Sequence, residues 1–252
     1  MKVSIITVVY NNHKTIANAI QSVLNQDYPD IEYIVVDGDS TDGTLEIIQQ
    51  YRHQIAKLIS ESDRGMYDAM NKGIQCATGD IIGMLNSDDF YPDTTTLSTV
   101  VREFQRHPVD IVFGDLVFVR PDNLDRIIRY YSCANFHPRQ FAWGWMPAHP
   151  TVFVKRDLYQ KYGLFKIDYQ IASDYELMVR FLAKHRAAYR YIPKVLVKMR
   201  TGGISTKNLA SNWILNREIV RGCAENGIST NMLRLLLKYP TKILQLVQRP
   251  QL

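Results

Sequence analysis

The chain has 252 residues, 46% of them hydrophobic and 22% charged, a composition typical of a folded globular protein and not of a disordered one. Its net charge of +5 suits phosphate-bearing ligands or an anionic membrane surface. The basic residues are spread along the chain rather than interleaved with aromatic residues, so we expect no nucleic-acid partner.

Short β-branched runs alternate with helical stripes over the first hundred residues. The runs predict buried strands over 3–9, 33–36, 58–60 and 81–85. Apolar residues at helical spacing predict helices over 16–24, 45–48, 66–77 and 97–104. This alternation predicts a doubly wound sheet, which binds ligands beyond the carboxyl ends of its strands. Polar residues follow all four strands, at 7–10, 37–41, 62–64 and 86–89.

The fourth strand leads into the most informative of these clusters. An apolar run ends there in Asn86, Ser87, Asp88 and Asp89. Carboxylate and amide oxygens suit Mg²⁺ or Mn²⁺ rather than zinc. The same residue types also form turns, so a strand end followed by a turn is the alternative interpretation.

The pattern changes in the second half of the chain. Strands of a mixed or antiparallel portion are predicted over 110–115, 117–119 and 127–131. The last segment, 206–252, combines leucine-rich helical stripes with basic residues, including Arg234, Lys238, Lys242 and Arg249. Two interpretations stay open for it: a basic amphipathic helix on an anionic membrane, or helices packed on the rest of the protein with their basic residues in solvent.

The cysteines and the apolar runs bear on location. Cys76, Cys133 and Cys223 are widely spaced and form no Cys-x-x-Cys pair, which favours reduced thiols. Residues 3–9 are too short for a signal-peptide core, and no run reaches eighteen apolar residues. We expect a cytoplasmic protein, with peripheral contact to the inner face of the cytoplasmic membrane if the basic tail binds it.

Four segments carry a family resemblance. VSIITVVYNN at 3–12, VVDGDSTDGT at 35–44, the run through 71–89 that ends in LNSDD, and SDYEL at 173–177 occur in the order and spacing of one family. Together they resemble the inverting family-two glycosyltransferases of the glycosyltransferase A-type fold. Within that family, SESDRGMYDAMNKG is most similar to enzymes that build bacterial surface polysaccharides.

The resemblance implies an architecture and an activity. It covers residues 1–205, with a nucleotide-sugar-binding half at 1–115, an acceptor half at 116–205, and a helical extension at 206–252. The fold would be a mixed α/β sheet with flanking helices. The activity would be transfer of one sugar from a nucleotide-diphosphate donor to a hydroxyl of a saccharide acceptor, expected to be lipid-linked. The Gln-x-x-Arg-Trp signature of processive synthases is absent from the sequence.

The resemblance also assigns donor contacts. The residues expected to bind the donor are Thr7, Tyr10, Asp37, Arg64, Asp68, Asn86, Asp88 and Arg200. Arg64 is expected to meet a phosphate or hold Asp88, because its planar fork suits either partner. The family normally shows Asp-x-Asp at the metal loop, whereas Asn86 takes the first position here. We therefore expect Asp88 as first ligand and Asp89 as second, with the cation arriving together with the donor diphosphate.

On the acceptor side, Asp174 aligns with the catalytic base of the family, and His149 resembles a family position near the acceptor side of the cleft. Trp145, close by, is expected either to stack on a sugar ring or to anchor a loop. A carboxylate at a helix N-terminus is also an ordinary cap, which is the alternative role for Asp174.

Two other functions compete with this assignment. A sugar-nucleotide pyrophosphorylase should show a glycine-rich loop where this chain has Tyr10-Asn11-Asn12, and a non-catalytic nucleotide-sugar-binding module stays open.

Overall fold

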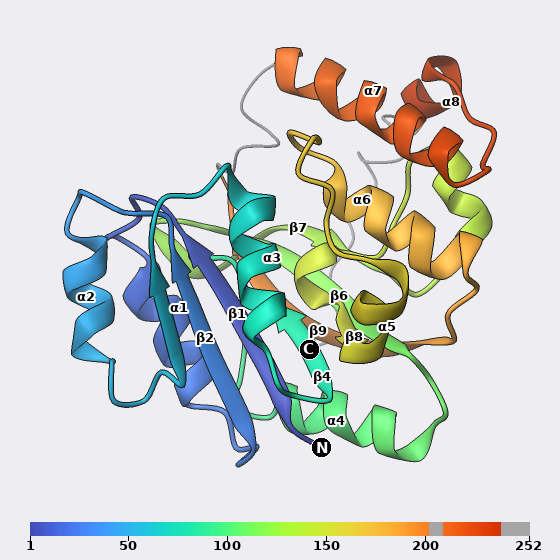
Figure 1. Cartoon of the computed structure of the whole chain (residues 1–252). Helices are drawn as coiled ribbons and strands as arrows, with labels where there is room; N and C mark the ends of the chain where they lie inside the picture. The colour runs from blue at the N-terminus through green and yellow to red at the C-terminus, as the bar shows by residue number, and fades with distance from the viewer. Residues whose placement is uncertain (202–208, 238–252) are drawn as a thin grey trace.

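The computed structural model of the chain describes residues 1–201 and 209–237 (Figure 1). In this part of the chain one mixed sheet runs through the molecule in the order β3-β2-β1-β4-β8-β6-β9-β5, with β7 paired to β6. Helices cover both of its faces. The predicted fold class is therefore confirmed, including the mixed character of the sheet.

The first half of the sheet is parallel. It contains β1 (Val3–Val9), β2 (Ile31–Asp37), β3 (Lys57–Ser60) and β4 (Ile81–Met84), with β1 paired to both β2 and β4. Most residues of β1, β2 and β4 are buried, which explains why apolar residues in these strands are not confined to alternate positions. In the register Val9 lies opposite Asp37, so the polar residues after β1 and β2 meet at one edge.

The second half of the sheet mixes directions. It contains β5 (Asp89–Phe90), β6 (Ile111–Arg120), β7 (Asn123–Tyr131), β8 (Phe153–Lys155) and β9 (Tyr189–Arg200). β8 runs antiparallel to β4 and β6, whereas β9 runs parallel to β6 and antiparallel to β5. The two strands predicted over 110–115 and 117–119 are one strand, β6, whose register against β9 shifts on either side of Asp115. The pairing of β9 with β5 brings Arg200 to the metal loop.

The helices divide into two layers. α1 (Ile16–Leu24), α2 (Thr44–Gln50) and α4 (Thr96–Arg106) cover one face of the sheet, over a core that includes Ile5 and Val35. The other face carries α3 (Met66–Cys76), α5 (Arg156–Tyr162) and α6 (Ser173–Met178), which runs on into the π-helical turn Val179–Lys184. Short 3₁₀ turns, η1 (Pro138–Trp143) and η2 (His149–Thr151), lie between β7 and β8.

The C-terminal helices pack on the second layer. α7 (Leu209–Glu225) lies across α6 (Figure 1), and its Ile219 and Cys223 are buried in the same core. α8 (Met232–Leu236) buries Leu235 and exposes Leu233 and Leu236. The structure therefore shows these two helices packed on the rest of the protein.

Parts of the tail prediction lie outside the described residues: 206–208 and 238–252, with Lys238, Lys242 and Arg249. Among the described residues, no helix is long and apolar enough to cross a membrane.

Candidate active site

The donor edge is built from the loops after β1 and β2. The carboxylate of Asp37 is buried, and its Oδ2 accepts hydrogen bonds from the Ser60 hydroxyl at 2.8 Å and the Ser40 backbone N–H at 3.2 Å. Its Oδ1 has no hydrogen-bond partner in the described part of the chain. The ring of Tyr10 is 64% exposed, so one of its faces is open to a ligand.

Gly38 lets these loops come together. A Cβ at this position would meet Asp63 Oδ2 at 2.5 Å and the Tyr10 ring at 3.5 Å, so only glycine fits without a shift. Thr7 differs from the other predicted donor residues. Its side chain is fully buried, and its hydroxyl accepts a hydrogen bond from Tyr33 at 3.1 Å. Thr7 therefore supports the sheet in this structure and does not line the edge.

The metal loop, residues 86–89, is tied to the loop after β1 by contacts that the sequence did not predict. The Asn12 amide donates to Ser87 Oγ at 2.8 Å, and the Thr15 hydroxyl donates to the Ser87 carbonyl at 2.8 Å. Arg200 reaches the loop from β9, donating to the Asp88 carbonyl at 2.5 Å and to Asn18 Oδ1 at 2.7 Å. The predicted donor residue Arg200 is thus a fixed cation beside the metal loop.

Two carboxylates lie side by side in this loop. Asp88 is partly exposed, whereas Asp89 is fully buried and accepts a hydrogen bond from the Asn86 amide at 2.9 Å. Burial raises the pKa of Asp88 against the lowering influence of Arg200. Burial, and then the charge of Asp88, raise the pKa of Asp89 well above its usual range.

These residues fit a divalent cation. Asp89 Oδ1 is a buried oxygen without a hydrogen-bond partner in the described chain, and a cation would relieve the repulsion between the two acids. No group of three His, Cys, Asp or Glu side chains gathers as a metal site within the described residues. A pair of carboxylates matches Mg²⁺ bound by one or two acids together with substrate phosphates.

Arg64 lies elsewhere than expected. Its guanidinium is largely exposed and contacts Asp68 Oδ1 at 3.2 Å, one helical turn along α3. The expectation that Arg64 holds Asp88 is wrong, because Asp68 takes its guanidinium and Arg200 contacts the metal loop. The backbone N–H of Arg64, more than its side chain, holds the pKa of Asp68 below its usual range.

Asp174 is the second residue of α6, on the same face of the sheet as α3, and its Oδ1 accepts the Tyr175 N–H at 2.8 Å. The residue before the helix is Ala172, so Asp174 is not its N-cap. Burial raises the pKa of Asp174, while the nearby His149 acts in the opposite direction. Burial also lowers the pKa of His149, which keeps its imidazole neutral near pH 7.

Aromatic rings and a second helix hold this carboxylate. The ring of His149 meets Phe165 edge-on at 5.6 Å, and Phe165 stacks on Tyr67 at 5.7 Å. Behind them, Glu218 of α7 accepts the backbone N–H groups of residues 170, 171 and 172 at 2.6 to 2.9 Å. A single side chain of the C-terminal helix therefore fixes the loop that leads into Asp174.

Trp145, the other residue expected on the acceptor side, follows η1. Its ring lies 6.0 Å from that of Tyr131. The main chain runs from it through Met146 to His149, and so joins the aromatic pair to the residues around Asp174.

A mixed α/β sheet with helices on both faces, an acidic loop after β4 and a partly buried carboxylate at the start of α6 matches a glycosyltransferase A-type fold. A sequence model of Glycosyl transferase family 2 matches residues 4–163, and the chain belongs to that family. This membership confirms the resemblance and makes the chain a glycosyltransferase.

Known proteins agree with this assignment. The chain is 26% identical over 223 residues to a PGL/p-HBAD biosynthesis glycosyltransferase of Mycobacterium bovis, covering 86% of this chain and 82% of the relative. It is 32% identical over 181 residues to an uncharacterized glycosyltransferase of Mycobacterium tuberculosis, covering 71% and 68%.

Two solved structures share the fold. S. aureus TarS in complex with UDP-GlcNAc has a TM-score of 0.69 at 20% identity, covering 91% of this chain and 68% of the TarS chain. The mannosyltransferase PcManGT of Pyrobaculum calidifontis, in complex with GDP-Man and Mn²⁺, has a TM-score of 0.60 at 20% identity, covering 99% and 81%.

Proposed function

We propose that this glycosyltransferase is inverting, depends on Mg²⁺ or Mn²⁺, and moves one sugar from a nucleotide-diphosphate donor to a hydroxyl of a saccharide acceptor in surface polysaccharide or glycolipid synthesis. The observation that carries the proposal is the presence together of a cation-compatible loop, Asp88 with Arg200, and a partly buried carboxylate with a raised pKa at Asp174.

The donor would lie along the edge formed by β1, β2 and the metal loop. Tyr10 offers an open ring face for the nucleobase, and Asp37 a buried oxygen free to accept a base N–H. Asp68 reaches toward the sugar or ribose from α3. The TarS and PcManGT structures contain a uridine and a guanosine donor respectively, so the fold itself accepts either base.

Asp88 would be the first ligand of the cation and Asp89 the second, through the Oδ1 that has no hydrogen-bond partner among the described residues, while Asp89 Oδ2 orients Asn86. When bound, a divalent cation supplies positive charge to the departing diphosphate. Arg200 adds a fixed positive charge beside the same loop, already held in place by Asn18 and the Asp88 carbonyl, so little reorganisation is needed as charge develops.

Asp174 would act as the base. Its carboxylate takes the proton of the acceptor hydroxyl while that oxygen bonds to the anomeric carbon, and the bond to the diphosphate breaks with its electron pair leaving on the phosphate oxygen. Attack from the side opposite the leaving group inverts the anomeric configuration. A raised pKa strengthens the carboxylate as a base near neutral pH.

The first experiment is a thermal-shift screen of sugar nucleotides against the full chain, with and without Mn²⁺. A ligand that binds only the folded state raises the melting temperature. We expect at least one nucleotide sugar to do so, and more strongly with the cation. A non-catalytic binding module would give the same shift, so transfer must then be measured for the wild type and D174N. No transfer by the wild type would leave only binding, and equal turnover in the two would remove the base assignment.

We also propose peripheral membrane contact through α8, consistent with a lipid-linked acceptor. Its Leu233, Leu236 and Leu237 are exposed beside the basic Arg234. This is the arrangement of a helix at an anionic lipid surface. L233S/L236S should lose sedimentation with anionic vesicles but keep the donor-induced thermal shift, and unchanged sedimentation would remove this part of the proposal.

A further inference from the structure

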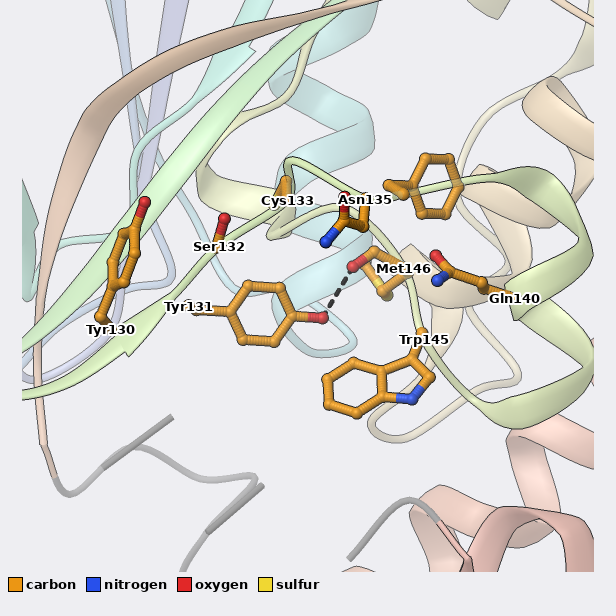
Figure 2. A pocket seen from close by; sticks show the side chains of 9 residues that line it. Tyr130, Tyr131, Ser132, Cys133, Asn135, Gln140, Trp145 and Met146 are labelled. Carbon is orange, nitrogen blue, oxygen red and sulfur yellow. Dashed lines mark hydrogen bonds between the residues drawn. The ribbon is translucent and has the colours of Figure 1, made fainter. Parts of the chain in front are cut away.

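A pocket of about 420 Å³ lies between the end of β7 and the segment through η1 (Figure 2). Tyr131, Trp145 and Met146 line it together with Tyr130, Asn135 and Gln140. Its volume is within the range of small-molecule sites, roughly 300 to 1,000 Å³. Of the residues assigned to the reaction above, it shares Trp145 alone.

The lining combines aromatic faces with free amides. The rings of Tyr131 and Trp145 lie 6.0 Å apart at 51°, so they do not stack on each other and leave ring surface toward the pocket. Gln140 Oε1 accepts the His137 N–H at 3.0 Å, which leaves its NH₂ group to donate. The Asn135 amide and the Trp145 indole N–H have no hydrogen-bond partner among residues 1–201 and 209–237.

The lining is electrically neutral, with no Lys, Arg, Asp or Glu among the described side chains that form it. The lining itself offers a phosphate or a diphosphate no counter-charge, and the guanidinium of Arg129 lies over the Tyr131 ring, 5.8 Å from its centroid, outside that lining. Aromatic faces with hydrogen-bonding amides and hydroxyls instead suit a ligand that has an apolar face and a rim of hydroxyl groups. A neutral pyranose ring has this character.

The walls are held before any ligand arrives. The Tyr131 hydroxyl donates to the Met146 carbonyl at 2.8 Å (Figure 2). Behind the pocket, the buried Asp115 accepts hydrogen bonds from the Tyr130 hydroxyl, from the Tyr191 hydroxyl at 2.8 Å and from the Cys133 N–H at 2.7 Å. Such fixed groups reduce the ordering cost of binding.

The pocket is connected to the base. The Ala148 N–H donates to Cys133 Sγ, at 3.4 Å, and the next residue is His149, beside Asp174. On the other wall, Phe141 of η1 meets Tyr175 of α6 edge-on at 5.5 Å. A saccharide held in the pocket would therefore lie on the same side of the sheet as the carboxylate.

From this lining and its connection to Asp174, we propose that the pocket binds a neutral pyranose ring of the acceptor saccharide, with Trp145 and Tyr131 against the ring and Asn135 and Gln140 on its hydroxyls. This inference rests on the proposed function, because only a transferase has an acceptor. The binding of the sugar ring can still be measured without any reaction.

The direct test uses fluorescence. The chain has three tryptophans, so W143F/W213F leaves Trp145 as the only indole. We expect at least one of the octyl glycosides of glucose, galactose, mannose, rhamnose and N-acetylglucosamine, below its micelle concentration, to change Trp145 emission saturably. The change should also occur in a background carrying D174N. Absence of a saturable change with all five glycosides would overturn the proposal.

The second test compares neighbouring tryptophans. W145A should raise the acceptor KM at least about tenfold and W145F less, whereas the control W143A, whose indole is outside the pocket, should keep the wild-type KM. Donor-induced thermal shift in all three variants shows that folding and the donor edge are intact. If that shift is absent from the wild type, the proposed function fails; if it is present and W145A keeps the wild-type KM, the pocket assignment fails.

Discussion

The two acidic centres of the site are held by different parts of the chain. Asp88 belongs to a loop fixed by strand neighbours: Arg200 enters from β9, and Asn86 lies three residues from its partner Asp89. Asp174 instead depends on helices, because its preceding loop is fixed by Glu218 of α7, nearly fifty residues later. The comparison shows that the loop of Asp88 is organised by the sheet, and the loop before Asp174 by the C-terminal helix α7.

The largest effect should come from the base side. D174N is expected to lower transfer by roughly 10²–10⁴-fold, the usual contribution of a general base, with the donor-induced thermal shift retained. D157N, an exposed acid in the first turn of α5, is the matched control. Wild-type transfer rates in D174N would refute the base assignment.

The same substitution should raise stability. Burial raises the pKa of Asp174, so the folded state binds the proton more tightly than the unfolded state, and wild-type stability falls as pH rises from the unfolded value of about 3.9 through the raised folded value. The D174N variant has no side-chain proton to lose in this pH range. Its melting temperature should exceed that of the wild type at pH 7, with the gap closing below about pH 4; a gap independent of pH would contradict burial as the cause.

On the sheet side, chelation or D88N should lower transfer by roughly 10²-fold or more, because the cation no longer neutralises the negative charge that develops on the leaving diphosphate. Activity of the wild type, but not of D88N, should return when Mn²⁺ is added back. D30N, an exposed acid far along the chain from the loop, should behave like the wild type. Full activity in chelator would show that Arg200 suffices without a cation.

Glu218 tests whether α7 positions the base. E218A leaves three backbone N–H groups without their carboxylate, so we expect a loss of about 1–3 kcal/mol in unfolding free energy. It should also lower kcat about tenfold by loosening the loop before Asp174, with the donor thermal shift kept and E218Q less affected. E46A is the control, because Glu46 is exposed on the outer side of α2. An unchanged kcat would make Glu218 purely structural.

The smallest effect concerns His149. Burial lowers its pKa, so the folded state binds fewer protons than the unfolded state, and stability should rise with pH from the lowered folded value up to about 6.5. H149Q should flatten the melting temperature across that interval. The same slope in H149Q and wild type would assign it to other groups.

The sequence predicted the sheet side far better than the helical side. The strands and helices of the first hundred residues follow the predicted ranges closely, because buried parallel strands and amphipathic helices leave local patterns. The sequence did not predict β8 and β9. β8 has only three residues, and the residues of β9 are only partly buried, so neither strand leaves a clear apolar pattern. Their places depend on partners far along the chain.

The site shows the same division. Asp88 and Asp174 stand in short motifs, so a family resemblance finds them. Glu218 acts through contacts with a segment distant in sequence, and nothing in its own surroundings marks it. Ser87 stands in the LNSDD motif, but its contacts with Asn12 and Thr15 join segments distant in sequence and could not be predicted. The charged tail predicted membrane binding and packing equally well, because composition does not tell which side chains face a neighbour; for α7 the structure shows packing. The predicted contact between Arg64 and Asp88 was wrong for the same reason.

The anomeric configuration of the product tests the central claim most directly. With the purified full chain, its donor, Mn²⁺ and an acceptor, ¹H NMR of the first product formed gives the coupling constant of the newly linked anomeric proton. Direct attack by a hydroxyl deprotonated by Asp174 predicts the configuration opposite to that of the donor. The donor's own configuration in the product would contradict it.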